Sequence, residues 1–243
     1  IMLIGLIFRG VAFEFRAKVR PERKRLWNLS FFWGSLITTL AQGYMLGIYV
    51  LGLDTSWLAT LFAFGVALAL TATYAFLGAA WLIFKAEDKL QLKAVRWARR
   101  TLVVMALGMG TISIVTPLAS DRIFSKWFSV PKIILLAPLP LVAGGIFVGL
   151  WFMLKKMPFS GDKFSWAPLL MGAGAMITGF AGLAYSFYPY VVPEKLTIYE
   201  AASATESLGI ILVGTLIVLP IILGYTVFAY TVFRGKATAL SYN

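Results

Sequence analysis

The side chains that could move protons are the chain's ten carboxylic acids, and none lies in the middle of an apolar run. They fall in the polar segments or within about a turn of a boundary: Glu14, Glu22, Asp54, Glu87, Asp88, Asp121, Asp162, Glu194, Glu200 and Glu206. A carboxylate at mid-membrane would by default mark an ion or proton pathway. The sequence therefore argues against a self-contained proton pump or cation transporter.

Two of these acids, Glu200 and Glu206, flank the start of the last apolar run. If that start is helical, Glu206 sits in the first turn, where a negative charge suits the helix dipole. Capping and solvation then explain both acids, and a proton or water path from the outer face is the alternative. Glu14 lies close to Arg9 and Arg16, and we expect it to pair locally.

Redox chemistry lacks its usual ligands, because the chain contains no cysteine and no histidine. Thiolate metal sites, iron–sulfur clusters and disulfides need cysteine, and helix-bundle proteins usually hold haem through histidine. The eight methionines have no histidine partner and are expected to serve as packing residues. No phosphate-binding glycine loop, zinc signature or nucleophile–base pair is present. We expect no catalytic residue, cofactor site or metal site in this chain.

The elements around these residues are membrane-spanning helices. The chain has 243 residues, of which 60% are hydrophobic and 13% charged, and its mean hydropathy is +0.85. Runs of about 20 apolar residues match the length needed to cross a bilayer as helix. The net charge of +12 lies in the connections between runs, where membrane topology explains it, and no nucleic-acid partner is expected.

The fold class is therefore all-α, a polytopic membrane helix bundle. We predict complete spans at residues 28–53, 57–84, 101–119, 133–154, 166–188 and 207–233. Residues 1–8 precede them as the tail of an earlier span, and we expect the natural N-terminus to be missing. Pro138 and Pro140 should distort the start of the fourth span, and Pro220 should kink the sixth.

Sidedness follows from the distribution of Lys and Arg. Of the 22, 18 lie in alternate connections, at residues 9–25, 85–100, 155–165 and 234–243. Cytoplasmic loops carry such an excess, so the basic loop of residues 9–25 and the C-terminus should be cytoplasmic in a plasma membrane. Both large basic loops could also attach to anionic lipid heads.

Small residues recur at close-packing intervals within the predicted spans. The pairs are Gly43 and Gly47, Gly145 and Gly149, Gly174 and Thr178, and Ala175 and Gly179. Such spacing lets helix backbones touch in lipid. We interpret these pairs as internal seams of the bundle, and a face for a second subunit is the alternative.

Three ordered motifs resemble subunit II of the cytochrome bd-type quinol oxidases, including the cyanide-insensitive branch. The first is R-G-V-A-F-E-F-R at residues 9–16, and the second is Y-A-F-L-G-A-A-W-L-I-F-K at residues 74–85. The third begins with Y-P-Y-V-V-P at residues 188–193 and continues to residue 236. The resemblance extends over nearly the whole chain.

The resemblance implies a structural and assembly subunit of a terminal oxidase that oxidises quinol and reduces dioxygen to water, building proton-motive force. The family's subunit II has two four-helix bundles, and here residues 1–100 would be the remainder of the first and 101–243 the second, with the tail. A partner, subunit I, carries haems b and d. The resemblance further implies contact with membrane lipids and the quinone pool, a structural quinone and a contribution to a proton route. The N-terminal positions of that route are absent here.

The motif positions are candidates for structural or subunit-interface roles, and none is expected to be catalytic. They are Arg9, Gly10, Phe13, Glu14, Arg16, Trp81, Lys85, Pro189, Pro193, Glu200, Ser207 and Pro220. A small-solute transporter fragment is the alternative function, because helices broken at Pro138, Pro140 and Pro220 could build a midplane site. We find no internal repeat to support it.

Overall fold

The computed structural model describes residues 1–233 and 235–236, and most of this chain is helical. The long helices are α1 Met2–Lys18, α2 Lys24–Val50, α3 Trp57–Lys85, α4 Asp88–Leu118, α7 Pro138–Lys156, α8 Ala167–Phe187 and α9 Thr205–Val232. The short elements are α5 Asp121–Phe128, α6 Lys132–Leu136, strands β1 Tyr190–Val192 and β2 Leu196–Thr197, and 3-10 turns at Pro21–Arg23 and Ser160–Asp162. The prediction of an all-α polytopic bundle is confirmed.

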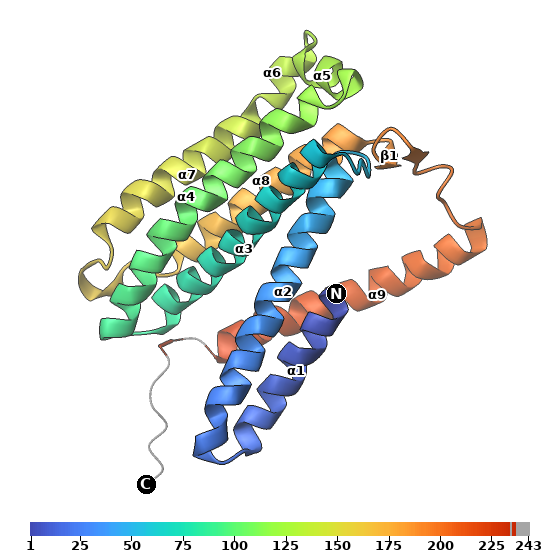
Figure 1. The fold of residues 1–243 in the computed structure, drawn as a ribbon. Coiled ribbons are helices and arrows are strands. Elements are labelled where there is room, and N and C mark those ends of the chain that lie inside the picture. Colours follow the sequence, from blue (N-terminus) through green and yellow to red (C-terminus); the bar gives the residue numbers. More distant parts are fainter. Residues whose placement is uncertain (234, 237–243) are drawn as a thin grey trace.

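Helix α3 is the centre of the bundle. It packs along α2 on one side and α4 on the other, and it also contacts α8, which pairs with α7. Figure 1 shows these five helices running side by side, with α1 lying against the first half of α2. The β1–β2 hairpin follows α8 and leads to α9.

The apolar core lies where α3, α4, α7 and α8 meet. Its largest fully buried side chains include Phe76 and Ile83 of α3, Met105 of α4, and Leu150 and Leu154 of α7. Many of the other buried positions of α3 are alanine. Small side chains bring helices close together, which is how helices gain packing energy where lipid offers no hydrophobic drive.

The predicted glycine seam between α2 and α3 is confirmed. A Cβ added at Gly43 would lie 2.5 Å from the Cα of Ala67, and one at Gly47 would lie 2.5 Å from the Cα of Ala63. The seam prediction is wrong at Gly145, where an added Cβ would meet nothing within 4 Å. The backbones of α2 and α3 can touch only because Gly43 and Gly47 carry no Cβ atom.

The two large basic segments are mostly helical, and their prediction as loops is wrong. Helix α1 continues to Lys18, and α4 begins at Asp88, so residues 88–100 are its first turns. Lys, Arg, Glu, Gln, Leu and Ala are all good helix formers, so charge at the membrane surface need not end a helix. The inward face of α4 is buried at Ala94, Val95 and Ala98.

Five of the six predicted spans are helices that are long and apolar enough to cross a membrane, among the residues described. The exception is the first predicted span, residues 28–53, which corresponds to α2. This helix has 27 residues but is not among the helices apolar enough to cross a membrane. Its sequence includes Asn28, Thr38 and Gln42, which lower its hydropathy. Helix α1, with 17 residues, is longer than the eight-residue tail that we predicted.

Prolines lie in two of the predicted spans, the fourth and the last. α6 ends at Leu136 and α7 begins at Pro138, so the distortion in the fourth span is confirmed. α9 is one uninterrupted helix with Pro220 inside it, and the kink at Pro220 stays a prediction.

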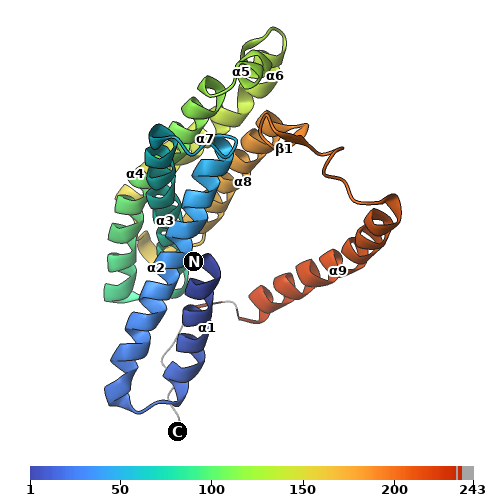
Figure 2. The same ribbon diagram turned by 45° about the vertical axis from the view of Figure 1, so that its right-hand side comes forward.

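Helix α9 stands away from the rest of the bundle. None of its 28 residues is buried, although the helix is overwhelmingly apolar. Figure 2 shows it set apart from the other helices, and the hairpin connects its N-terminal end to α8. At its C-terminal end the ring of Tyr230 packs edge-on against Trp81 of α3, with centroids 5.7 Å apart. Of the tail expected at residues 234–243, the described residues include only Gly235 and Lys236.

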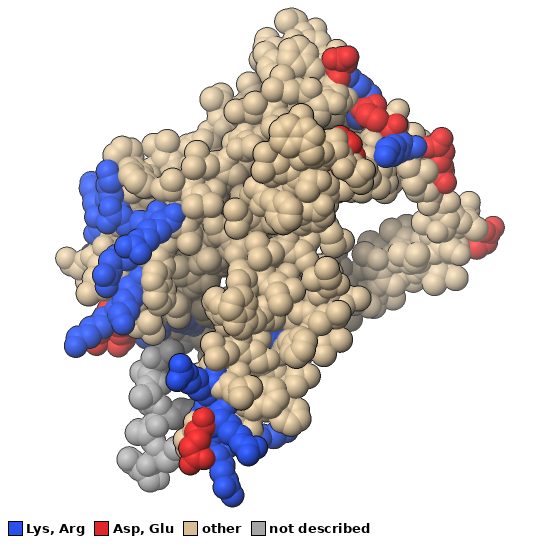
Figure 3. Space-filling model, viewed as in Figure 1, with Lys and Arg blue, Asp and Glu red and all other residues tan. Residues whose placement is uncertain are grey.

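Charge is segregated between the two ends of the molecule. In Figure 3, Lys and Arg gather where α1 meets α2 and at the lower-left ends of the helices, whereas acidic side chains dominate around the hairpin. This arrangement agrees with the alternation of basic connections along the sequence.

Candidate functional site

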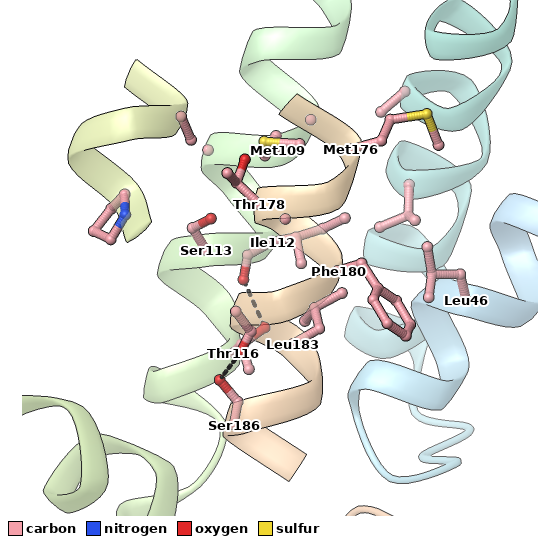
Figure 4. Close-up of a pocket in the computed structure, with 18 of the residues that line it drawn as sticks. Leu46, Met109, Ile112, Ser113, Thr116, Met176, Thr178, Phe180, Leu183 and Ser186 are labelled. Atoms are coloured by element: carbon pink, nitrogen blue, oxygen red, sulfur yellow. Dashed lines mark hydrogen bonds between the residues drawn. The ribbon is translucent and has the colours of Figure 1, made fainter. Parts of the chain in front are cut away.

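A cavity of about 1240 Å³ lies between α2, α3, α4, α7 and α8. In Figure 4, Ser113 and Thr116 project from α4, while Thr178 and Ser186 project from α8. Small residues such as Gly110 and Gly144 leave the space open, since a Cβ at either would meet nothing within 4 Å. A void of this size exceeds any packing defect expected of a protein interior.

The residues around the cavity do not fit a haem. The nearest soft donors are the thioether sulfurs of Met105, Met109 and Met176, and the chain offers no histidine to complete an axial pair. The terminal methyl group of Met109 packs against Gly179, and a Cβ atom added at Gly179 would lie 2.8 Å from that methyl group. Among the described residues, no group of three or more acidic, histidine or cysteine side chains could hold a metal ion.

Helix α5 closes one end of the cavity and is fastened to the C-terminus of α8. The ammonium of Lys126 donates to the carbonyls of Tyr185, at 2.6 Å, and Tyr188, at 2.8 Å. The indole of Trp127 donates to the hydroxyl of Ser186 at 2.8 Å. A cation at a helix C-terminus compensates the unpaired carbonyls and the dipole there. Burial lowers the pKa of Lys126, and the positive charges of Arg122 and Lys132 lower it further.

An ion pair ties α5 to the hairpin. The Arg122 guanidinium donates to Glu194 at 2.9 Å and lies 4.6 Å from the ring of Tyr190. Ser120 also donates to Glu194, at 2.7 Å. Burial raises the pKa of Glu194, but the hydrogen bonds from Ser120 and Arg122 outweigh it and hold that pKa below its usual value. The hairpin therefore has a fixed position against the bundle.

A second polar cluster lies at the opposite end, around Asp162 in the α7–α8 connection. Its carboxylate accepts from Gln91 of α4 at 2.5 Å and pairs with the ammonium of Lys236 at 2.5 Å. Lys236 also donates to the carbonyls of Ile83 and Ala86 at the end of α3. Burial raises the pKa of Asp162, but hydrogen bonds from Lys236, Gln91 and Ser165 lower it to a greater extent. This cluster, which we call the Asp162 clamp, joins α3, α4, the α7–α8 connection and the segment after α9.

The first motif lies on exposed faces of α1. The ammonium of Lys18 pairs with Glu14 at 2.7 Å, and Arg16 donates to Asn28 at 2.5 Å, so the predicted local pairing of Glu14 is with Lys18 rather than arginine. Arg9 lies 5.6 Å from the ring of Phe31 in α2. Gly10 faces open space, and Phe13 is 73% exposed.

The second motif contacts the end of α9. The ammonium of Lys85 donates to the carbonyls of Phe233, at 2.6 Å, and Gly235, at 2.9 Å. It also lies 5.4 Å from the ring of Trp81, which packs on Tyr230. The structure therefore brings Trp81 and Lys85 together at the point where α9 meets α3.

The third motif builds the hairpin. The carbonyl of Pro189 accepts from the amide of Ile198 at 2.8 Å, and Glu200 accepts from the amide of Thr197 at 2.8 Å. The hydrogen bonds from the amide and the hydroxyl of Thr197 lower the pKa of Glu200. The carbonyl of Pro193 approaches Gly52, where φ is +64° and an added Cβ would lie 2.8 Å away. Ser207 and Pro220 lie apart from the hairpin, on exposed positions of α9.

Sequence reasoning missed the cavity and both fastening clusters. Gln91 and Asp162 lie in two different basic connections, 85–100 and 155–165, and their separation of 71 positions in the sequence hid their contact. Arg122 and Lys126 are two of the four basic residues that lie outside the alternate basic connections, and the sequence alone assigns them no contact. Their spacing of four on a short helix was the available signal, because such residues share one helix face.

Comparison with known proteins identifies the family. A family model described as cytochrome bd terminal oxidase subunit II matches residues 1–233. Over 257 aligned residues, the chain is 23% identical to the cytochrome bd ubiquinol oxidase subunit 2 of Bacillus subtilis (strain 168), an alignment that covers 98% of this chain and 72% of that protein. The structure of the bd oxidase from Geobacillus thermodenitrificans matches with a TM-score of 0.68 at 16% identity, over 96% of this chain and 72% of that chain. That structural likeness supports the fold.

Proposed function

Because the chain belongs to the cytochrome bd terminal oxidase subunit II family, we propose that it is the haem-free structural and assembly subunit of a membrane quinol oxidase. The complex would take electrons from the quinone pool, reduce dioxygen to water and contribute to proton-motive force. The observation that carries this proposal is the family match over residues 1–233 in a chain without histidine or cysteine.

The redox steps belong, in this proposal, to a haem-bearing subunit I that holds haems b and d. This chain supplies a scaffold of helices whose two ends are fastened by the Asp162 clamp and by the contacts of α5. The structural quinone and the proton route implied by the resemblance are assigned to no residue of this chain. The motif residues Trp81 and Lys85 would set the position of α9, and Pro189, Pro193 and Glu200 would set the hairpin.

The topology that we propose places the turn between α1 and α2 and the Asp162 clamp in the cytoplasm, with α5 and the hairpin on the outer face. The excess of Lys and Arg at the first end supports it. We also propose the division into a first unit, residues 1–100, and a second, residues 101–243. Its boundary lies inside the continuous helix α4.

The transporter alternative finds little support. It needs helices interrupted near the midplane, and α9 continues through Pro220. The break that does exist, between Leu136 and Pro138, follows a five-residue helix at the start of its span and lies away from the middle.

Co-purification from native membranes tests the proposed function. An affinity tag on this chain should bring down a haem-bearing membrane protein whose reduced-minus-oxidised spectrum shows haems b and d, together with quinol oxidase activity. Deleting the gene should abolish accumulation of that partner. The proposal would be refuted if the tagged chain purified without a haem-bearing partner and the deletion strain kept full bd-type activity in its membranes.

A further inference from the structure

The wall of the cavity is chemically suited to hydrocarbon. Hydroxyl groups on it are already engaged as donors: Thr73 donates to Ala69 at 2.8 Å, Thr116 to Ile112 at 2.7 Å and Thr178 to Gly174 at 3.1 Å. A ligand carbonyl placed among them would lose its hydrogen bonds to water and find few donors in return, which costs free energy. An alkyl chain makes no such demand.

The cavity is open to the membrane and too large to stay empty there. Met45 and Phe180, which line it, are 58% and 74% exposed, so it opens between helices toward the surrounding lipid. Its volume of about 1240 Å³ exceeds the range of about 300–1,000 Å³ typical of pockets for small organic ligands. An open apolar groove of this volume in a bilayer fills with hydrocarbon, because the walls of an empty groove would lose their dispersion contacts.

One end of the cavity reaches a cluster of positive charges. Trp127, Phe128 and Ile133 line that end, and Lys126 and Lys132 are their sequence neighbours. Lys132 is exposed and forms no ion pair with the described residues. The acidic groups nearby are Glu194, which is paired with Arg122, and Asp121 in the first turn of α5.

The aromatic rings beside these cations mark the level of the membrane surface. Phe124 and Phe128 of α5 are half exposed, with ring centroids 4.7 Å apart, and Trp127 lies between them in sequence. Aromatic residues concentrate at the level of lipid headgroups, and basic residues there attract anionic lipids. The end of the cavity therefore combines an apolar channel with a cationic rim at headgroup depth.

We propose that this cavity holds an acyl chain of an anionic glycerophospholipid whose phosphate lies beside Lys132 and Lys126 at the junction of α5 and α6. The charge of the rim selects the headgroup, and the cavity between α4, α7 and α8 takes the chain. The bound lipid would fill the gap in the bundle and hold α7 against α4. The site is independent of the redox reaction of the complex.

Filling the cavity with protein tests the acyl-chain half of the proposal. In Gly144→Leu and Gly110→Leu the new side chain enters open space, so the bundle can form around it. Gly78→Leu is the control, because its Cβ also meets nothing within 4 Å but lies outside this cavity. Native mass spectrometry of the whole complex, purified in mild detergent and accepted only if its haem spectrum is intact, should show one retained phospholipid. That lipid should persist in Gly78→Leu and be lost in the two cavity variants.

Changing the rim tests the headgroup half. Complexes equilibrated in nanodiscs of phosphatidylglycerol and phosphatidylethanolamine should retain the anionic lipid with about fivefold enrichment, the selectivity expected of one basic residue at a membrane surface. Lys132 supplies this selectivity, because the Lys126 ammonium already donates to the carbonyls of Tyr185 and Tyr188. Lys132→Gln, an exposed substitution, should abolish that enrichment, and Lys195→Gln should leave it unchanged. Three results would overturn the proposal: no stoichiometric phospholipid in the unmodified complex, the same lipid retained in both cavity variants, or a quinone in its place.

Discussion

At the residue scale, the Asp162 carboxylate and the Lys236 ammonium together join four segments of the chain. Gln91 and Lys236 both reach the carboxylate, and Lys236 in turn satisfies carbonyls at the end of α3. Charge-assisted hydrogen bonds that are partly shielded from water stabilise a fold more than exposed ion pairs do.

Asp162→Asn should therefore loosen the segment after α9. The amide can still accept from Gln91, but it no longer attracts the ammonium of Lys236. We expect the purified complex to lose about 1–3 kcal/mol of unfolding free energy, the usual cost of a charge-assisted hydrogen bond, measured by thermal unfolding. Glu22→Gln, an exposed change in the turn before α2, is the matched control and should have no measurable effect. Equal losses in both variants would show that the clamp contributes nothing specific.

The pH dependence of that loss has a definite sign. The folded-state pKa of Asp162 lies below the ordinary value of 3.8, so its stabilising contribution is complete above that value and disappears as pH falls through the lower, folded-state pKa. The difference in melting temperature between the original chain and Asp162→Asn should be constant from pH 8 to about pH 5 and shrink below about pH 4. A difference that grew on acidification would contradict the assigned direction.

At the element scale, close packing of α2 on α3 depends on two glycines without Cβ atoms. A methyl group at Gly43 would lie 2.5 Å from backbone, and the two helices would have to separate. Several neighbouring contacts along this seam would be lost together, because packing in lipid relies on close backbone approach.

Gly43→Ala should thus lower the amount of assembled protein, with a destabilisation of about 1–3 kcal/mol, the usual cost of overpacking. Gly65→Ala in α3 is the control, since its new methyl group meets nothing within 4 Å. Alanine has the better helix propensity, so the control should be neutral or slightly stabilising. Membrane abundance and the melting temperature of the purified complex measure both. A Gly43→Ala chain as stable as Gly65→Ala would show that the helices are farther apart than described.

Elements also differ in how well their sequence predicts them. The long apolar helices were predictable because length and hydropathy reflect bilayer thickness. The first turns of α4 were not, because a basic amphipathic segment can be a solvated loop or a packed helix, and only the contacts of Ala94 and Ala98 with the core decide. α5 escaped prediction for the same reason.

At the scale of the whole molecule, sidedness can be measured directly, because the chain contains no cysteine. We expect Lys195→Cys, between the hairpin strands, to react with a membrane-impermeant maleimide on intact cells. Lys89→Cys, at the start of α4, should react only in inverted vesicles. Both native side chains are exposed, so burial does not hide either site. The reverse labelling pattern would overturn the topology.

The apolar runs determined by themselves that this is a helical membrane protein, because only hydrocarbon accommodates so much apolar surface at that length. The alternation of basic connections indicated its sidedness, and the motif at residues 9–16 indicated its family. Tertiary structure alone decided the cavity, the separation of α9 and the meeting of Gln91 with Asp162. Hydropathy and charge act on each segment independently of its partners. A contact across 71 residues depends instead on how close each pair of helices can approach, which their small residues set jointly.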